Sequence, residues 1–171
     1  MEDDLFRFLT PMFSPRKYPP EETQRKLANW CDRKEHTHWQ AREKLIEWGV
    51  PHREREELIG NMIEKNLINE SRYASAFASD KFRFYRWGAI KIKVALKANG
   101  VSEANINAAI RSLPQTEIVK SIRGLVEKKL QQCTGLKIYQ KKMKVARFII
   151  GKGFPPELVW KEIEMAFMES T

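Results

Sequence analysis

The chain has 171 residues, of which 42% are hydrophobic and 31% are charged, and its formal net charge is +9. This length suits one compact domain or several small helical modules, and eight glycines with eight prolines are too few for a loop-rich β fold. Two cysteines outside any CxxC motif indicate free thiols in a reducing cytosol. The first residues lack the basic and apolar regions of a signal peptide, and the apolar runs are far shorter than the ~18 residues of a membrane span. We therefore expect an all-α protein of the cytoplasm, without a membrane segment.

The first third of the chain is expected to hold an arm and three helices. Residues 1–20 should form a flexible arm, because four prolines interrupt every helical pattern there. Apolar spacing predicts helices over about 21–35 and about 38–48, and a third from Pro51 to near Asn66. Gly49 should end the second of these helices.

More helices are expected on both sides of Gly100. Asn69 should cap the first of them by accepting a hydrogen bond from the following turn. Gly88 should separate two helices, because glycine tolerates the backbone angles of a tight junction. Gly100 should end the second in the left-handed conformation, and Pro114 should stop a short third helix. Three further helices are expected in residues 115–171.

A repeat organises the chain around Gly49, Gly100 and Gly153, which lie 51 and 53 residues apart. An apolar residue stands four positions before each glycine, directly after it, and ten positions after it. A period near 50 with two helical breaks predicts a three-helix module used three times, in an elongated and curved array. The expected boundaries are an arm over 1–20 and repeats over 21–68, 69–114 and 115–171.

The positive charge is unevenly distributed along the chain. Residues 1–69 carry a net charge of −1, whereas 70–113 and 114–171 carry +5 each. The windows 81–97 and 128–152 contain no acidic residue. This segregation favours a polyanion or an acidic protein groove as partner, with a solvated helical face as the alternative. The candidate contact residues are the basic ones in these segments: Arg72, Lys81, Arg83, Arg86, Lys91, Lys93, Lys97, Lys137, Lys141, Lys144 and Arg147.

The expected faces of two helices group these cations. A helix extended through 86–97 would place Arg86, Lys93 and Lys97 on one side. Lys137, Lys141 and Lys144 should share a side of a later helix.

No catalytic constellation stands out, so an enzyme is the weakest interpretation and no cofactor is expected. The run from Gly151 to Gly153 lacks the spacing of a P-loop. Cys31, His36 and His38 lack a second pair at metal-site spacing and are interpreted as a buried thiol and two surface histidines. The tryptophans are assigned to the core or to packing between modules rather than to base stacking; those considered are Trp39, Trp48, Trp87 and Trp160.

Two stretches within the triple unit have a distinctive pattern: Leu67-Ile-Asn-Glu-Ser-Arg-Tyr-Ala-Ser-Ala-Phe and Gly88-Ala-Ile-Lys-Ile-Lys-Val-Ala-Leu-Lys-Ala-Asn-Gly-Val. Together with the triple unit, they resemble the RecX family of bacterial recombination regulators. The resemblance covers about 21–168 and is strongest at 67–101. The matching residues are Arg72, Tyr73, Ala74, Phe77, Gly88, Lys91, Ile92, Leu96, Gly100 and Val101. Ile68, Glu70 and Lys91 are mild departures from the most common residues of the family pattern.

The resemblance implies three tandem three-helix repeats and no catalysis. It implies binding to the RecA recombinase as its filament on single-stranded DNA, in the helical groove, with suppression of ATP hydrolysis and strand exchange. We expect a monomer whose contact with single-stranded DNA is weak and salt-dependent. The residues alone leave two alternatives: a general DNA-binding helical protein that acts without the recombinase, and a scaffold for another acidic protein.

Overall fold

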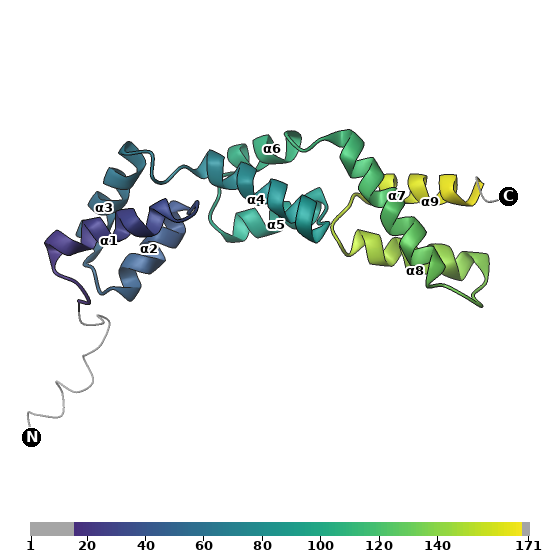
Figure 1. Ribbon diagram of the computed structural model, residues 1–171, viewed down its shortest axis with the longest axis horizontal. Coiled ribbons are helices and arrows are strands. Elements are labelled where there is room, and N and C mark those ends of the chain that lie inside the picture. Colours follow the sequence, from purple (N-terminus) through teal and green to yellow (C-terminus); the bar gives the residue numbers. More distant parts are fainter. Residues whose placement is uncertain (1–15, 169–171) are drawn as a thin grey trace, which may run out of the picture. The chain divides into compact units, whose positions relative to one another are not determined.

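The computed structural model describes residues 16–168, which form nine α-helices and no strand (Figure 1), as the sequence predicts for its fold class. The helices are α1 (Pro20–Asp32), α2 (His38–Glu47), α3 (His52–Glu64), α4 (Glu70–Tyr85), α5 (Ala89–Ala98), α6 (Glu103–Arg111), α7 (Gln115–Gln131), α8 (Ile138–Ile150) and α9 (Pro156–Met168). None of these helices has the length and apolarity needed to cross a bilayer. Most of the expected arm, residues 1–15, lies outside the described residues.

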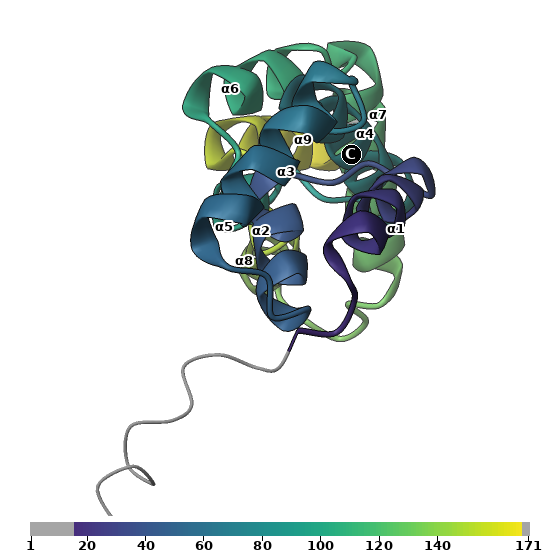
Figure 2. The ribbon, with the colours of Figure 1, turned by 90° about the vertical axis from the view of Figure 1, so that its left-hand side faces the viewer.

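The chain divides into two compact units, one up to residue 73 and one from residue 74 onward. In the first unit, which Figure 2 brings to the front, α1, α2 and α3 enclose a core around Leu27, Leu45 and Met62, all fully buried. Burying a leucine side chain stabilises a fold by about 1.5–3 kcal/mol, so these positions hold the three helices together. The first helix, α1, ends at Asp32, three residues before the predicted end near residue 35.

Residues 16–18 pack against the first unit. The Lys17 amide donates to the Trp48 carbonyl over 2.9 Å, and the Tyr18 ring meets Trp48 edge-on. The Arg16 guanidinium donates to both carboxylate oxygens of Glu54, over 2.6 and 2.7 Å. This pairing holds the pKa of Glu54 below its usual value. The end of the expected arm therefore has defined contacts.

The repeat predicted from the sequence is present in the backbone. Gly49, Gly100 and Gly153 have φ values of 68°, 74° and 89°, a left-handed region that favours glycine. Each of their amides donates to the carbonyl three residues earlier, over 2.9, 3.0 and 2.8 Å. The apolar residues four before and one after each glycine are all buried; they are Leu45, Leu96, Ile149, Val50, Val101 and Phe154. At the position ten residues after, Ile59 and Ile163 are buried and Ile110 is half-buried.

Side-chain caps fix the starts of α2 and α4. The Thr37 hydroxyl accepts from the Gln40 amide over 3.1 Å at the start of α2. The Asn69 side-chain oxygen accepts from the Arg72 amide over 3.0 Å, as predicted for the start of α4. The preceding helix, α3, ends at Glu64, and Asn66 takes a left-handed conformation with φ of 54°.

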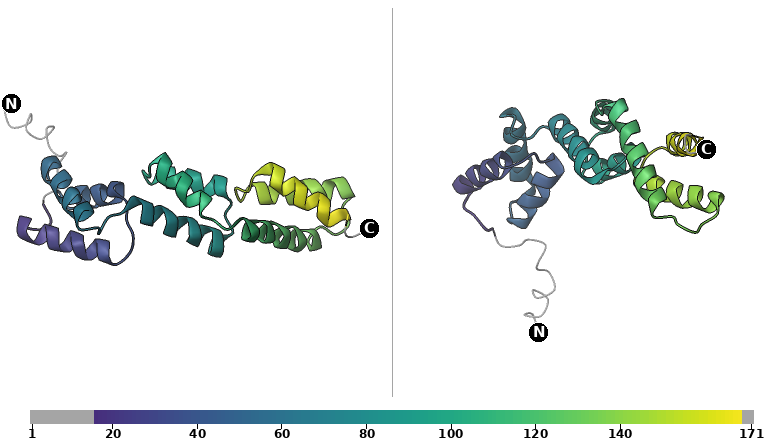
Figure 3. Two further views of the ribbon diagram at one scale, coloured as in Figure 1. Left: turned by 90° about the horizontal axis from the view of Figure 1, so that it is seen from above. Right: turned by 45° about the vertical axis from the view of Figure 1, so that its right-hand side comes forward.

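In the second unit, α5 packs against α6, and α7, α8 and α9 pack against one another. Figure 3 shows α9 lying beside α7 and α8. The core of this unit includes these fully or almost fully buried apolar residues: Ile92, Leu96, Ile106, Ile122, Val126, Ile149, Phe154 and Ile163.

Gly88 separates α4 from α5 as predicted, but the expected reason is wrong. Its φ of −83° is open to any residue. A Cβ at Gly88 would instead lie 2.3 Å from backbone atoms of Gly153 and Phe154. The Gly88 amide donates to the Lys152 carbonyl over 2.8 Å, and the Ile90 amide donates to the Gly153 carbonyl over 3.0 Å. Glycine is required at position 88 because the backbone there contacts the backbone of Gly153 and Phe154 directly.

Candidate nucleic-acid interface

The link between α4 and α5 presents cations together with aromatic rings. We call this the junction surface and define it by Lys81, Arg83, Phe84, Tyr85, Arg86, Trp87 and Lys91. The Lys81 ammonium lies 4.3 Å from the centroid of the Tyr85 ring and 5.2 Å from that of Trp87. The Lys91 ammonium lies 4.5 Å from the Trp87 centroid. These contacts are within the range of cation–π attraction, so the rings orient both lysines.

Two aromatic side chains of the junction surface face solvent. Phe84 is 77% exposed and Tyr85 is 56% exposed. Exposed aromatic rings beside cations are the elements with which proteins hold single-stranded nucleic acid, since bases stack on the rings and phosphates meet the cations. The sequence prediction selected these cations but missed Phe84 and Tyr85 and assigned Trp87 to packing, although all three rings stand beside the cations in the sequence.

Arg86 does not continue a helix into α5, which corrects the expected grouping of Arg86 with Lys93 and Lys97. α4 ends at Tyr85, and Arg86 has φ of 54°, in the left-handed region. Its amide donates to the Phe82 carbonyl over 3.2 Å. This turn separates Arg86 from the face of α5 that carries Lys93 and Lys97.

Two cations of α5 lie close to an acidic residue, Glu103, which is outside the acid-free window of residues 81–97. Lys93 and Lys97 have their ammonium groups 3.2 and 3.7 Å from the Glu103 carboxylate at the start of α6. All three side chains are exposed, and such pairs contribute only about 0–1 kcal/mol to stability. They nevertheless lower the positive potential on this side of α5. The acid-free window 81–97 does not include Glu103, which approaches Lys93 and Lys97 only because α6 packs on α5.

Arg72 is engaged within the first unit. Its Nε lies 2.5 Å from a carboxylate oxygen of Glu35. Its terminal nitrogens donate to the Asn66 side-chain oxygen over 3.1 Å and to the Asn66 carbonyl over 2.9 Å. These bonds hold the left-handed turn at Asn66. The geometry thus gives Arg72 a structural role, and a role toward a partner stays a prediction.

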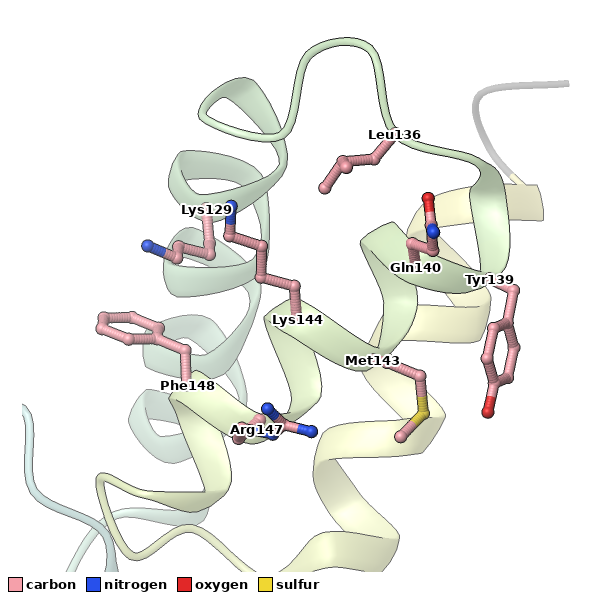
Figure 4. A pocket seen from close by; sticks show the side chains of 8 residues that line it. All are labelled: Lys129, Leu136, Tyr139, Gln140, Met143, Lys144, Arg147 and Phe148. Carbon is pink, nitrogen blue, oxygen red and sulfur yellow. The ribbon is translucent and has the colours of Figure 1, made fainter.

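A second candidate surface lies on α8 and the neighbouring part of α7. An open hollow of about 770 Å³ is lined by the residues that define this α8 surface: Lys129, Leu136, Tyr139, Gln140, Met143, Lys144, Arg147 and Phe148. Figure 4 shows Lys129 and Lys144 on the side of Phe148, with Tyr139 and Met143 on the other side. The Lys129 ammonium is 4.8 Å from the Phe148 centroid, and Tyr139 is 72% exposed. Cations and apolar rings are therefore combined here as well.

The remaining predicted cations of this region flank the α8 surface. Lys137 is exposed and caps α8, and its amide donates to the Gln140 side chain over 3.1 Å. Lys141 is half-buried one turn later. Of the predicted residues, the hollow brings together Lys144 and Arg147. Sequence reasoning missed Lys129 as a lining residue, because it comes from α7.

No group of three or more metal-ligating side chains occurs between residues 16 and 168. The expectation that His36 lies on the surface is wrong, since it is 3% exposed and stacks on Trp30 with ring centroids 3.4 Å apart. Burial lowers the pKa of His36. Burial also raises the pKa of the Cys31 thiol to about 11, as suits an inert buried thiol.

Of the tryptophans assigned to the core, Trp48 is buried, whereas Trp39 is exposed.

Comparison with known proteins points to one family. Models of the second and third three-helix domains of RecX match residues 69–110 and 115–163. The regulatory protein RecX of Streptomyces coelicolor is 24% identical over 133 residues, which are 78% of this chain and 71% of that protein. That of Pseudomonas savastanoi pv. phaseolicola is 28% identical over 92 residues, and that of Halalkalibacterium halodurans is 25% identical over 104. The matches cover 54% and 61% of this chain but only 59% and 39% of those two relatives.

Solved structures agree on the fold. The crystal structure of RecX from Lactobacillus salivarius has a TM-score of 0.81 at 19% identity, covering 87% of this chain and 97% of that one. A second crystal structure of a regulatory protein RecX has a TM-score of 0.77 at 17% identity, covering 85% of this chain and 72% of that one. The matched domain models span more than half of the residues and include both basic surfaces. The chain therefore belongs to the RecX family of regulatory proteins.

Proposed function

We propose that this protein binds the filament of the RecA recombinase on single-stranded DNA, in the filament groove, and lowers its ATPase and strand-exchange activity. It does so as a cytoplasmic monomer, without a cofactor and without catalysing a reaction. The observation that carries the proposal is the match of the two RecX domain models to the part of the chain that holds the junction and α8 surfaces.

The positive charge and the exposed apolar rings support a partner whose surface is both anionic and apolar. Residues 70–113 and 114–171 each carry +5, which suits the phosphates of DNA or an acidic protein groove. The exposed rings Phe84, Tyr85 and Tyr139 add apolar area beside those cations. Lysine and arginine contacts to phosphates position a protein without reading base sequence, so we expect binding that is independent of DNA sequence.

The contact residues we propose fall into two groups by their internal partners. Lys93 and Lys97 share Glu103, and Arg72 is held by Glu35, so these three contribute less. The cations without an ion pair among residues 16–168 contribute more; they are Lys81, Arg83, Arg86, Lys91, Lys137, Lys141, Lys144 and Arg147.

The first test measures DNA-dependent ATP hydrolysis by the recombinase, with single-stranded DNA in excess, while this protein is titrated. Loss of hydrolysis at amounts far below those that saturate the DNA is the expected result, because the protein then acts on the filament. Unchanged hydrolysis would overturn the inhibitory proposal.

A charge-reversed variant assigns the surface. Lys144→Glu with Arg147→Glu changes two exposed cations of the α8 surface. Arg25→Glu with Arg53→Glu makes the same charge change on exposed residues of the first unit and serves as the control. We expect the α8 pair to abolish inhibition and the control pair to retain most of it. Equal loss in both variants would mean that overall charge, rather than the α8 surface, governs binding.

A second candidate function is DNA binding without the recombinase, which the exposed rings of the junction surface favour. It predicts inhibition only when the protein sequesters the DNA. Direct binding to single-stranded DNA should then weaken with salt, with each phosphate contact adding about 0.7 to the logarithmic slope. Inhibition that disappears when DNA is added in excess would select this alternative.

A further inference from the structure

A smaller hollow of about 470 Å³ lies between the α4–α5 link and α7 in the second unit. We call it the Arg86 pocket. Its polar lining consists of Arg86, Lys120, Lys128, Ser121 and Glu117. Three cations stand against one carboxylate, so the pocket has an excess of positive charge.

The cations of the Arg86 pocket are only partly satisfied within the protein. The Lys120 ammonium lies 3.0 Å from the Glu117 carboxylate, which leaves that pair neutral. Arg86 and Lys128 form no ion pair with any residue between 16 and 168. Two unpaired cations that line one concave site favour an anion as ligand.

Ser121 supplies an independent sign of a ligand. The residue is 7% exposed, and its hydroxyl oxygen is buried without a hydrogen-bond partner among the described residues. A buried polar group without a partner is unfavourable, and native proteins rarely keep one. A ligand oxygen in the Arg86 pocket would give this hydroxyl an acceptor.

The backbone at Arg86 is also unusual. A left-handed conformation, here with φ of 54°, is disfavoured for an arginine, and non-glycine residues held in it cluster at functional sites. Glycine would form the same turn without strain. An arginine in this turn suggests that its guanidinium has a use that glycine could not serve.

We propose that the Arg86 pocket binds a phosphate group. The Arg86 guanidinium would donate to two oxygens as a fork, Lys128 would neutralise charge, and the Ser121 hydroxyl would donate to another oxygen. A phosphate group carries several oxygens around one phosphorus atom, so it can accept hydrogen bonds from donors on both the α4–α5 link and α7. The phosphate comes either from the backbone of single-stranded DNA or from a nucleoside triphosphate. The first source rests on the proposed function, and the second does not.

The test uses the full chain without the recombinase. Binding of a labelled oligothymidylate is measured by fluorescence anisotropy at low salt, and binding of ATP is measured by calorimetry. Ser121→Ala and Arg86→Gly should each lower the affinity for the phosphate-bearing ligand by about tenfold. This is the effect of losing one hydrogen bond to a charged group. Arg86→Gly removes the side chain but is compatible with the left-handed turn.

Two matched controls separate the pocket from general charge and from helix effects. Arg111→Ala removes one exposed cation from α6 in the same unit, and Ser75→Ala removes an exposed hydroxyl from a helix. Both should bind as the unchanged protein does. Ser121→Ala should in addition unfold at the same or a higher temperature, because it deletes an unsatisfied hydroxyl.

Each outcome decides the proposal. Weakened oligothymidylate binding alone assigns DNA as the source, and weakened ATP binding alone assigns the nucleotide. Unchanged binding of both ligands to Ser121→Ala, equal losses in Arg111→Ala and Arg86→Gly, or no binding to the unchanged protein would overturn it. Because no recombinase is present, these results are independent of the ATPase titration.

Discussion

The contact between Gly88 and Gly153 should make Gly88→Ala strongly destabilising for the second unit. The backbone of Gly88, with φ of −83° and ψ of 168°, is one that alanine adopts freely, so any loss must come from the contact. The added Cβ would lie 2.3 Å from the carbonyl carbon and oxygen of Gly153 and from the amide nitrogen of Phe154. Because these are backbone atoms, no side chain can rotate away, and the two segments must separate.

The size of the effect follows from what separation removes. Two backbone hydrogen bonds, from Gly88 to Lys152 and from Ile90 to Gly153, are lost. Each contributes about 0.5–1.5 kcal/mol, and overpacking adds typically about 1–3 kcal/mol. We expect a loss of about 2–6 kcal/mol, a large share of the roughly 5–15 kcal/mol that usually stabilises a domain.

Gly124→Ala is the matched control in the same unit. Gly124 lies inside α7 and is exposed, and a Cβ there would meet nothing within 4 Å. Alanine in a helix interior is about 0.5–1 kcal/mol better than glycine, so this variant should be more stable than the unchanged chain.

Hydrogen exchange read by mass spectrometry across a urea series is the suitable assay, because it follows peptides of the second unit separately from those of the first. Gly88→Ala should shift unfolding of the peptides around α5 and α9 to lower urea, while Gly124→Ala shifts it to higher urea. The reasoning fails if Gly88→Ala unfolds at the same urea concentration as the unchanged chain. It also fails if the two substitutions shift in the same direction.

Three further predictions concern the titratable and charged groups. Burial lowers the pKa of His36 in the folded state, so the unfolded state binds more protons near pH 6. The free energy of unfolding should therefore fall as the pH drops below about 6.5, by at most about 1.4 kcal/mol per pH unit. Urea unfolding between pH 5 and 7 checks this, and His36→Phe, which keeps a ring against Trp30, should remove most of the slope. Arg123→Ala should cost about 1–3 kcal/mol in thermal unfolding, because the half-exposed Arg123 donates to the carboxylate of Glu162, which is 2.5 Å away and 3% exposed; adding Glu162→Gln should restore part of the loss. Cys31, with a pKa of about 11, should react with a thiol reagent at pH 8 at least about a hundredfold more slowly in the folded chain than in urea, as peptide mapping would show.

Local chemistry explains why so much of the fold could be predicted from the sequence. Helix positions follow from apolar spacing, and the left-handed glycines at 49, 100 and 153 follow from a conformational rule that acts within one turn. The Asn69 cap is equally local. The concentration of positive charge after residue 69 is read directly from the order of the residues.

Contacts between distant residues decided the rest. Gly88 is needed because Gly153 touches it from 65 residues away, and Lys93 and Lys97 are paired because α6 brings Glu103 to α5. The burial of the Ser121 hydroxyl without a hydrogen-bond partner among residues 16–168 is likewise visible only in the tertiary structure. Helical propensity and spacing describe one segment at a time, so they cannot state which side chains of different helices meet. The tertiary structure alone makes those pairings, because burial and hydrogen bonding depend on atoms that are close in space but remote along the chain.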